Sequence, residues 1–209
     1  MRSIASRLPL RVIVAALMTL SLAACNKAGG PLTTDDMSQG NASAKVTVIE
    51  YASVGCPVCG RWDMDIFPSF KAKYIDTGKV HYVFREMLVG QSEELNLGVA
   101  GFLLARCAGK DKYFAVTDAI FHVQPDIYGG KVDAHTALLN VAKSVGMNET
   151  QFDACINDAA GLTALQKRAE DHAVNDHIDS TPTFVVNGVM LTPGYHPLSD
   201  LDAAIAAAH

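Results

Sequence analysis

A Cys-Pro-Val-Cys motif directly after a strand-like segment is the feature that most constrains the fold of this chain. Residues 46–51 read Val-Thr-Val-Ile-Glu-Tyr, and their β-branched side chains predict a strand. Apolar residues recur at helical spacing after the second cysteine, from Trp62 to Tyr74, with a kink expected at Pro68. The two cysteines therefore stand where a strand ends and a helix begins. The free N–H groups and the dipole of a helix N-terminus favour a thiolate, so the motif predicts a redox-active pair.

The length and net charge of the chain limit the size of its fold and the kinds of partner it can bind. The chain has 209 residues, of which 49% are apolar and 19% charged, so it can form one globular domain with an insertion. The formal net charge is −5. Binding to nucleic-acid phosphates needs clustered Lys and Arg, so nucleic acid is not expected as a partner.

The N-terminus has the pattern of a targeting segment. Arg2, Arg7 and Arg11 precede an almost wholly apolar run over 12–24. As a helix this run would be about 20 Å long, short of the roughly 30 Å hydrocarbon core, so residues 1–24 predict a signal peptide rather than a membrane span. The run ends Leu-Ala-Ala-Cys at 22–25, which resembles the lipobox of bacterial lipoproteins and implies a lipid on Cys25. The alternative is an ordinary signal peptide followed by a chance cysteine.

The next segment predicts a spacer and a compartment. Residues 25–43 are mainly small and polar without apolar periodicity, so a flexible tether is expected there. With Cys25 set aside, an even number of cysteines remains, which suits an oxidising compartment. The predicted location is the cell envelope, facing the periplasm and anchored to the membrane by lipid.

The remaining chain alternates between β and α patterns. A second strand is expected over 80–86, and helical periodicity then extends over about 92–177. Strand residues return at 183–186, followed by Asn187-Gly188, a hairpin turn signal, and by a last helix from Leu198. These elements predict an α/β fold in which a helical insertion interrupts a small sheet.

Three features together resemble the DsbA-like branch of the thioredoxin superfamily. They are Glu-Tyr-Ala-Ser-x-x-Cys-x-x-Cys at 50–59, Thr-Pro-Thr-Phe-Val-Val-Asn-Gly at 181–188, and the helical block between them. The resemblance covers about 44–207 and implies a thioredoxin fold with an all-helical insertion. It also implies a protein thiol–disulfide oxidoreductase that needs no cofactor. DsbA-like isomerases usually dimerise through an added N-terminal domain. The short tether offers no such domain, so an oxidase is favoured, and a monomer is expected.

The chemistry and the resemblance assign roles to five residues. Cys56 is expected to be the exposed nucleophile, and Cys59, one turn deeper, resolves the mixed disulfide. Pro182 resembles the cis-proline that faces the cysteine pair in this fold, which lets Thr181 pair with a substrate backbone. Glu50 matches the buried acid of the family and would carry protons for Cys59. The alternatives are an ordinary trans proline at 182 and a solvated glutamate at 50.

The two residues inside the motif are expected to border the substrate. Pro57 lacks an N–H group, which is harmless in the first turn of a helix. Many strong oxidants of this family have His where this chain has Val58. Because Val58 offers neither charge nor hydrogen bond to a Cys56 thiolate, the reduced form is less stabilised and a weaker oxidant is predicted.

The other two cysteines lie in the helical block. Cys107 and Cys155 predict a structural disulfide that closes a loop of 48 residues. Two buried free thiols, or a regulatory disulfide that tunes the active pair, remain alternatives.

The predicted function is oxidation of cysteines in exported proteins, with a membrane redox partner that recycles the pair. A reductase or isomerase direction is the first alternative. A copper- or zinc-binding thiol protein is the second, although the histidines show no ligand spacing with the cysteines and no metal site is expected. The third is a non-catalytic lipoprotein, which the presence of both motif cysteines disfavours.

Overall fold

The computed structural model describes residues 28–208. The predicted signal peptide (1–24), Cys25 and the first residues of the predicted tether lie outside this range. Within 28–208, no helix combines the length and the apolar character that crossing a membrane requires.

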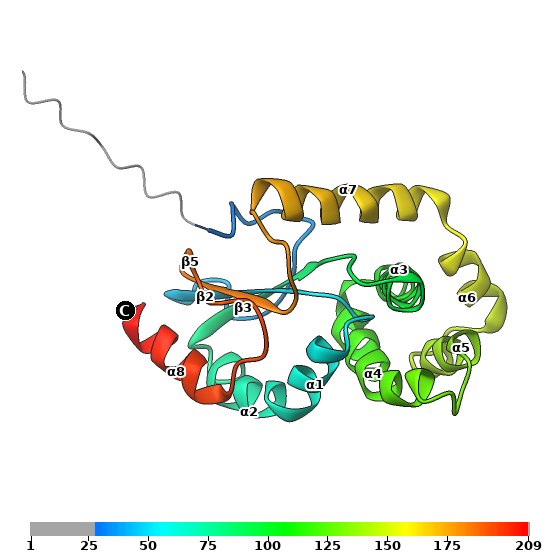
Figure 1. Cartoon of the computed structure of the whole chain (residues 1–209), viewed down its shortest axis with the longest axis horizontal. Helices are drawn as coiled ribbons and strands as arrows, with labels where there is room; N and C mark the ends of the chain where they lie inside the picture. Colours follow the sequence, from blue (N-terminus) through cyan, green and yellow to red (C-terminus); the bar gives the residue numbers. More distant parts are fainter. Residues whose placement is uncertain (1–27, 209) are drawn as a thin grey trace, which may run out of the picture.

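A five-stranded mixed sheet forms the centre of the fold, in the order β1-β3-β2-β4-β5 (Figure 1). The strands are β1 (Met37–Gly40), β2 (Val46–Ala52), β3 (Val80–Glu86), β4 (Thr183–Val186) and β5 (Val189–Met190). The central strand β2 runs parallel to β3 and antiparallel to β4. All seven residues of β3 are buried, as expected for a strand covered on both faces.

Helices cover both faces of this sheet. Figure 1 shows α1 (Pro57–Asp65), α2 (Phe67–Phe70) and α8 (Leu198–Ala207) on one side and α7 (Ala159–Asn175) on the other. A π-helical turn, η1 (Lys71–Ile75), continues α2. The predicted kink appears as the break between α1 and α2, where Pro68 stands in the first turn of α2. The sheet and α1 enclose Trp62 and Phe184, whose ring centroids are 4.7 Å apart.

Five helices lie between β3 and β4, where the sequence predicts a helical insertion. They are α3 (Ser92–Cys107), α4 (Lys110–Tyr128), α5 (Ala134–Ser144), α6 (Glu149–Ile156) and α7. Their buried side chains, among them Phe102, Ile120 and Phe152, belong to the same hydrophobic core as the sheet. The insertion is therefore packed onto the sheet and holds α4 against α1, beside the cysteine motif.

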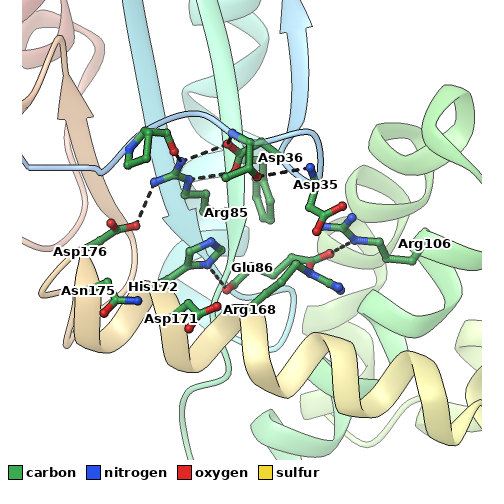
Figure 2. A pocket seen from close by; sticks show the side chains of 13 residues that line it. Asp35, Asp36, Arg85, Glu86, Arg106, Arg168, Asp171, His172, Asn175 and Asp176 are labelled. Carbon is green, nitrogen blue, oxygen red and sulfur yellow. Dashed lines mark hydrogen bonds and ion pairs between the residues drawn. The ribbon is translucent and has the colours of Figure 1, made fainter.

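The prediction of a flexible tether over 25–43 is wrong for the described part of that range. Residues 37–40 form β1, which pairs antiparallel with β3. The segment before β1 is bound by Arg85, which is 3% exposed and forms ion pairs with Asp36 and with Asp176, the residue that follows α7 (Figure 2). The guanidinium also donates to the carbonyl oxygens of Gly29 and Pro31. The sequence of this segment, which is small and polar without periodicity, gives no sign that it binds Arg85, because Arg85 lies about 50 residues further along the chain.

A second charged cluster lies beside the first. Glu86, at the end of β3, is fully buried and pairs with Arg106 of α3 at 2.6 Å and with Arg168 of α7 at 2.8 Å. Figure 2 shows both arginines around a cavity of about 270 Å³ that the N-terminal segment helps to line. These pairs join two helices of the insertion to the C-terminal end of β3.

Candidate active site

The cysteine motif lies at the junction of β2 and α1. Cys56 is the N-cap residue of α1, with an extended backbone (φ −85°, ψ 119°), and Pro57 begins the helix. The backbone N–H of Cys59 donates to Cys56 Sγ at 3.4 Å. Cys56 is 7% exposed and Cys59 is fully buried, and both are free thiols in this structure. The arrangement offers one accessible sulfur and one sulfur that is reached only through it.

The two thiols differ in acidity. The hydrogen bond from the Cys59 thiol, reinforced by the backbone N–H groups of Cys59 and Val58, lowers the pKa of Cys56 to about 6 despite partial burial. Burial raises the pKa of Cys59 well above its usual value, and its hydrogen bond to Cys56 adds to this rise. At neutral pH, Cys56 is therefore the thiolate and Cys59 its proton-bearing partner.

The Thr181–Pro182 segment faces Cys56. The carbonyl oxygen of Thr181 lies 3.7 Å from Cys56 Sγ, and the Thr181–Pro182 peptide bond is cis. The next residue, Thr183, begins β4, which pairs with β2 and so fixes the segment beside the motif. Residues 125 positions apart in the sequence thus meet at one sulfur.

Glu50 lies inside the protein beneath the motif. It belongs to β2, is 2% exposed, and accepts a 2.5 Å hydrogen bond from the Tyr82 hydroxyl of β3. Burial raises the pKa of Glu50 to about 8, partly offset by the Tyr82 hydrogen bond. A carboxyl group in this range can both take and return a proton at neutral pH.

Pro57 is exposed and Val58 is half-buried, so both border the open side of Cys56. A groove begins at Pro57 and continues between α1 and the adjoining ends of α3 and α4. Side chains of both signs line it, among them Arg61 and Glu93. A substrate bonded to Cys56 would therefore meet polar as well as apolar surface.

Two side chains of α4 hold the motif from the side of the insertion, and neither is predicted from the sequence. Gln124 Nε2 donates to the carbonyl oxygens of Val54, at 2.8 Å, and Cys56, at 3.3 Å. The Tyr128 hydroxyl donates to the Gly55 carbonyl oxygen. Gly55 itself allows a close approach, because a Cβ there would lie 1.9 Å from the Glu94 carbonyl oxygen. Such contacts across about 70 residues leave no local signal in the sequence.

Tyr82 and Asp63 were also missed. The sequence predicts Tyr82 only as a strand residue. Its hydrogen bond to Glu50 depends on the register in which the parallel strands β2 and β3 pair. Asp63 follows Cys59 by four residues, and this helical spacing is the one signal that could have drawn attention to it.

The other cysteine pair is joined by a disulfide. Cys107, at the end of α3, is bonded to Cys155 of α6 with a Cα–Cα distance of 5.7 Å. The bond therefore ties two helices of the insertion together. Over residues 28–208, no group of three or more potential metal-ligating side chains includes Cys56 or Cys59.

Comparisons with known proteins agree with this geometry. Residues 32–207 match the family model described as Thioredoxin. A candidate protein-disulfide oxidoreductase of Rickettsia bellii is 31% identical over 171 residues, which cover 82% of this chain and 63% of the relative. A similar protein of Rickettsia conorii is 30% identical, and the match covers 82% of this chain and 59% of that protein. The chain thus spans about 60% of the length of these relatives.

Solved structures show the same architecture. Wolbachia pipientis alpha-DsbA1 superimposes with a TM-score of 0.75 at 27% identity, covering 85% of this chain and 92% of that one. BdbD from Bacillus subtilis, in its oxidised form, gives a TM-score of 0.73 at 22% identity and covers 87% of this chain and 96% of that one. The thioredoxin fold with a helical insertion, expected from the sequence, is thereby confirmed.

Proposed function

Because the chain belongs to the DsbA-like thiol–disulfide oxidoreductases of the thioredoxin family, we propose that it introduces disulfides into exported proteins through Cys56 and Cys59. The observation that carries this proposal is the unequal pair itself. Cys56 is the acidic sulfur at the surface, and Cys59 is the buried sulfur of high pKa. A stabilised Cys56 thiolate makes this sulfur a good leaving group, which favours transfer of the disulfide to a substrate.

The proposed reaction moves two electrons from substrate to protein. A substrate thiolate attacks Cys56 Sγ of the oxidised pair, the Cys56–Cys59 bond breaks, and Cys59 leaves as a thiolate that takes up a proton. A second substrate thiolate then attacks the substrate sulfur of the mixed disulfide. Cys56 leaves as a thiolate, and the substrate keeps the new disulfide. Glu50 supplies the proton that Cys59 receives.

Three further residues would position the substrate. The carbonyl oxygen of Thr181 faces Cys56, so the backbone there is placed to pair with the backbone of a bound segment. Pro182 holds this segment opposite the sulfur and cannot bind a metal. Pro57 and Val58 form the adjacent surface of the motif.

The cellular setting belongs to the same proposal. Residues 1–24 direct export, a lipid on Cys25 anchors the protein to the membrane, and the domain faces the periplasm as a monomer. Its substrates are folding exported proteins with cysteines, and a membrane redox partner reoxidises the pair. The Cys107–Cys155 disulfide stabilises the folded domain.

The decisive experiment combines activity with the redox state in cells. Oxidised protein should form disulfides in a reduced, unfolded cysteine-containing protein, and Cys56→Ser should abolish this activity. Cys59→Ser cannot form the Cys56–Cys59 disulfide. Its Cys56 thiolate should instead attack disulfides of oxidised substrate and accumulate as mixed disulfides, because the Cys59 thiol that would release the substrate is absent. In acid-quenched cells, the Cys56–Cys59 pair should be mostly a disulfide. A mostly dithiol pair would instead establish the reductase or isomerase direction.

A further inference from the structure

Cys59 must exchange a proton in every catalytic cycle, although its side chain is fully buried. In the reduced protein, its thiol contacts Cys56, which is 7% exposed and offers a way out. In the mixed disulfide this exit is closed, because the Cys56 sulfur is bonded to the substrate and carries no proton. Glu50 is only 2% exposed and does not reach water by itself. The proton that Cys59 exchanges therefore needs a second pathway, which leads from Glu50 to solvent.

Asp63 lies on the same face of α1 as Cys59, one helical turn further along. Glu50 is coupled electrostatically to both residues. The negative charge of Glu50 contributes to the raised pKa of Cys59, after burial and the hydrogen bond and charge of Cys56. The charge of Asp63 likewise contributes to the raised pKa of Glu50, after burial. Glu50 is thus coupled both to the buried sulfur of the motif and to a carboxyl group of α1.

The carboxyl group of Asp63 joins the interior to the surface. In the described part of the chain, Asp63 Oδ2 is the one buried side-chain oxygen or nitrogen atom without a hydrogen-bond partner. On the outer side, Asp63 faces Asp118 and His122 of α4, and the polar atoms of these three side chains lie within 4.8 Å of one another. Asp118 and His122 are both exposed. A proton that reaches Asp63 is therefore next to water-accessible side chains.

Building on the function proposed above, we propose that Asp63 relays the proton of Cys59 between Glu50 and the water-exposed Asp118–His122 surface while a substrate occupies Cys56. Asp63 does not touch the reacting sulfurs and acts through Glu50. The transfer is a pure proton movement: Cys59 gains the proton that Glu50 gives up, and Asp63 restores it from the surface. In the reverse direction the same groups remove the proton of Cys59 before it attacks.

The surroundings of Asp63 suit this task. Burial raises its pKa to about 7, the charge of Asp118 adds to the rise, and His122 opposes it. From the sheet side, Glu50 of β2 and Tyr82 of β3 are coupled to its charge. Both protonation states of Asp63 are therefore populated near neutral pH, which a relay group requires.

The test isolates the step in which Cys59 acts. The full-length protein is prepared with glutathione bonded to Cys56, and the release of glutathione by Cys59 is followed in H₂O and D₂O from pH 5 to 9. Asp63→Asn should slow release about tenfold at neutral pH, less than the roughly 10²–10⁴-fold that a directly acting acid–base group contributes, because Asp63 acts through Glu50. It should also increase the solvent isotope effect, because proton transfer then limits the rate. Asp63→Glu should restore both values.

Asp65→Asn is the matched control, since Asp65 is an exposed carboxylate at the end of the same helix. It should behave as the wild type. An unchanged release rate and isotope effect in Asp63→Asn would overturn the relay. A shifted pH midpoint of the release rate without a larger isotope effect would also overturn the relay, because that result would assign Asp63 a purely electrostatic role.

Two further measurements separate the relay from other failures. In Asp63→Asn, the pH midpoint for alkylation of Cys56 should differ from the wild-type midpoint only by the small shift that loss of one negative charge causes. If the wild type itself forms no mixed disulfide, the proposed function fails, whereas a defect confined to release concerns the relay alone. If Asp63→Asn does not fold, Asp118→Leu/His122→Leu covers the surface end with apolar side chains. That double variant should slow release, and a wild-type rate would overturn the relay.

Discussion

The backbone N–H of Cys59 points at the sulfur of Cys56, 3.4 Å away, across the first turn of α1. This contact and the hydrogen bond from the Cys59 thiol stabilise negative charge on Cys56 in the reduced protein. No positively charged side chain is among the groups that lower the pKa of Cys56. The acidity of the site thus comes from hydrogen bonds at a helix start rather than from an ion pair.

Alkylation should report this acidity directly. We expect the reduced protein to react with iodoacetamide at Cys56 with a midpoint near pH 6, while Cys59 stays unreactive because it is buried and protonated. The Cys56 pKa is lowered on folding, so its contribution to stability is complete above the unfolded pKa near 9 and disappears as pH falls through about 6. Reduced protein should therefore gain stability between pH 6 and 9 relative to Cys56→Ser, as urea titrations can measure. A midpoint near 9 would contradict the assignment.

Replacing Val58 should change the redox potential. A histidine at this position would place a partial positive charge beside the Cys56 thiolate and lower its pKa by about one unit. One pKa unit corresponds to about 1.4 kcal/mol, or about 30 mV for a two-electron couple, so Val58→His should be more oxidising. Equilibration with glutathione buffers measures the potential. Val58→Ile offers neither charge nor hydrogen bond and should stay near the wild-type value; an equal potential in Val58→His and Val58→Ile would contradict the argument.

The Cys107–Cys155 disulfide should act on stability alone. It closes a loop of 48 residues, so its removal in Cys107→Ala/Cys155→Ala should lower the free energy of unfolding by about 4 kcal/mol in the chain-entropy model. The potential of the Cys56–Cys59 pair should stay the same, because the bond joins α3 and α6. A potential displaced by tens of millivolts would instead support a regulatory disulfide.

The buried Glu86 cluster should be essential for holding the insertion on the sheet. Glu86→Gln leaves two largely buried guanidinium groups, those of Arg106 and Arg168, without a carboxylate. Such a change typically costs about 3 kcal/mol or more, to be measured by denaturant unfolding of the reduced and oxidised protein. Lys167→Ala removes an exposed ion pair with Asp171 on the same helix and should cost under about 1 kcal/mol. Similar losses in both variants would count against the importance of burial here.

Local sequence was sufficient for the main elements of the fold and for the reactive pair. The β-branched run before Cys56, the helical spacing after Cys59 and the Asn187-Gly188 turn each encode their own conformation within a few neighbouring residues. Both residues of that turn have positive φ, at 47° and 88°. The identity of the exposed and the buried sulfur followed from their order at a helix start.

Only the tertiary structure decided what surrounds the pair and what holds the domain together. β1 pairs with β3, and the segment before it binds Arg85, about 50 residues away, although the composition of both is that of a spacer. Tyr82 reaches Glu50 through strand register, Gln124 reaches the motif through helix packing, and Asp63 meets Asp118 and His122 across two helices. Periodicity in a sequence records which face of an element is apolar. It does not record which polar groups meet when those faces pack, because that depends on contacts between residues far apart in the chain.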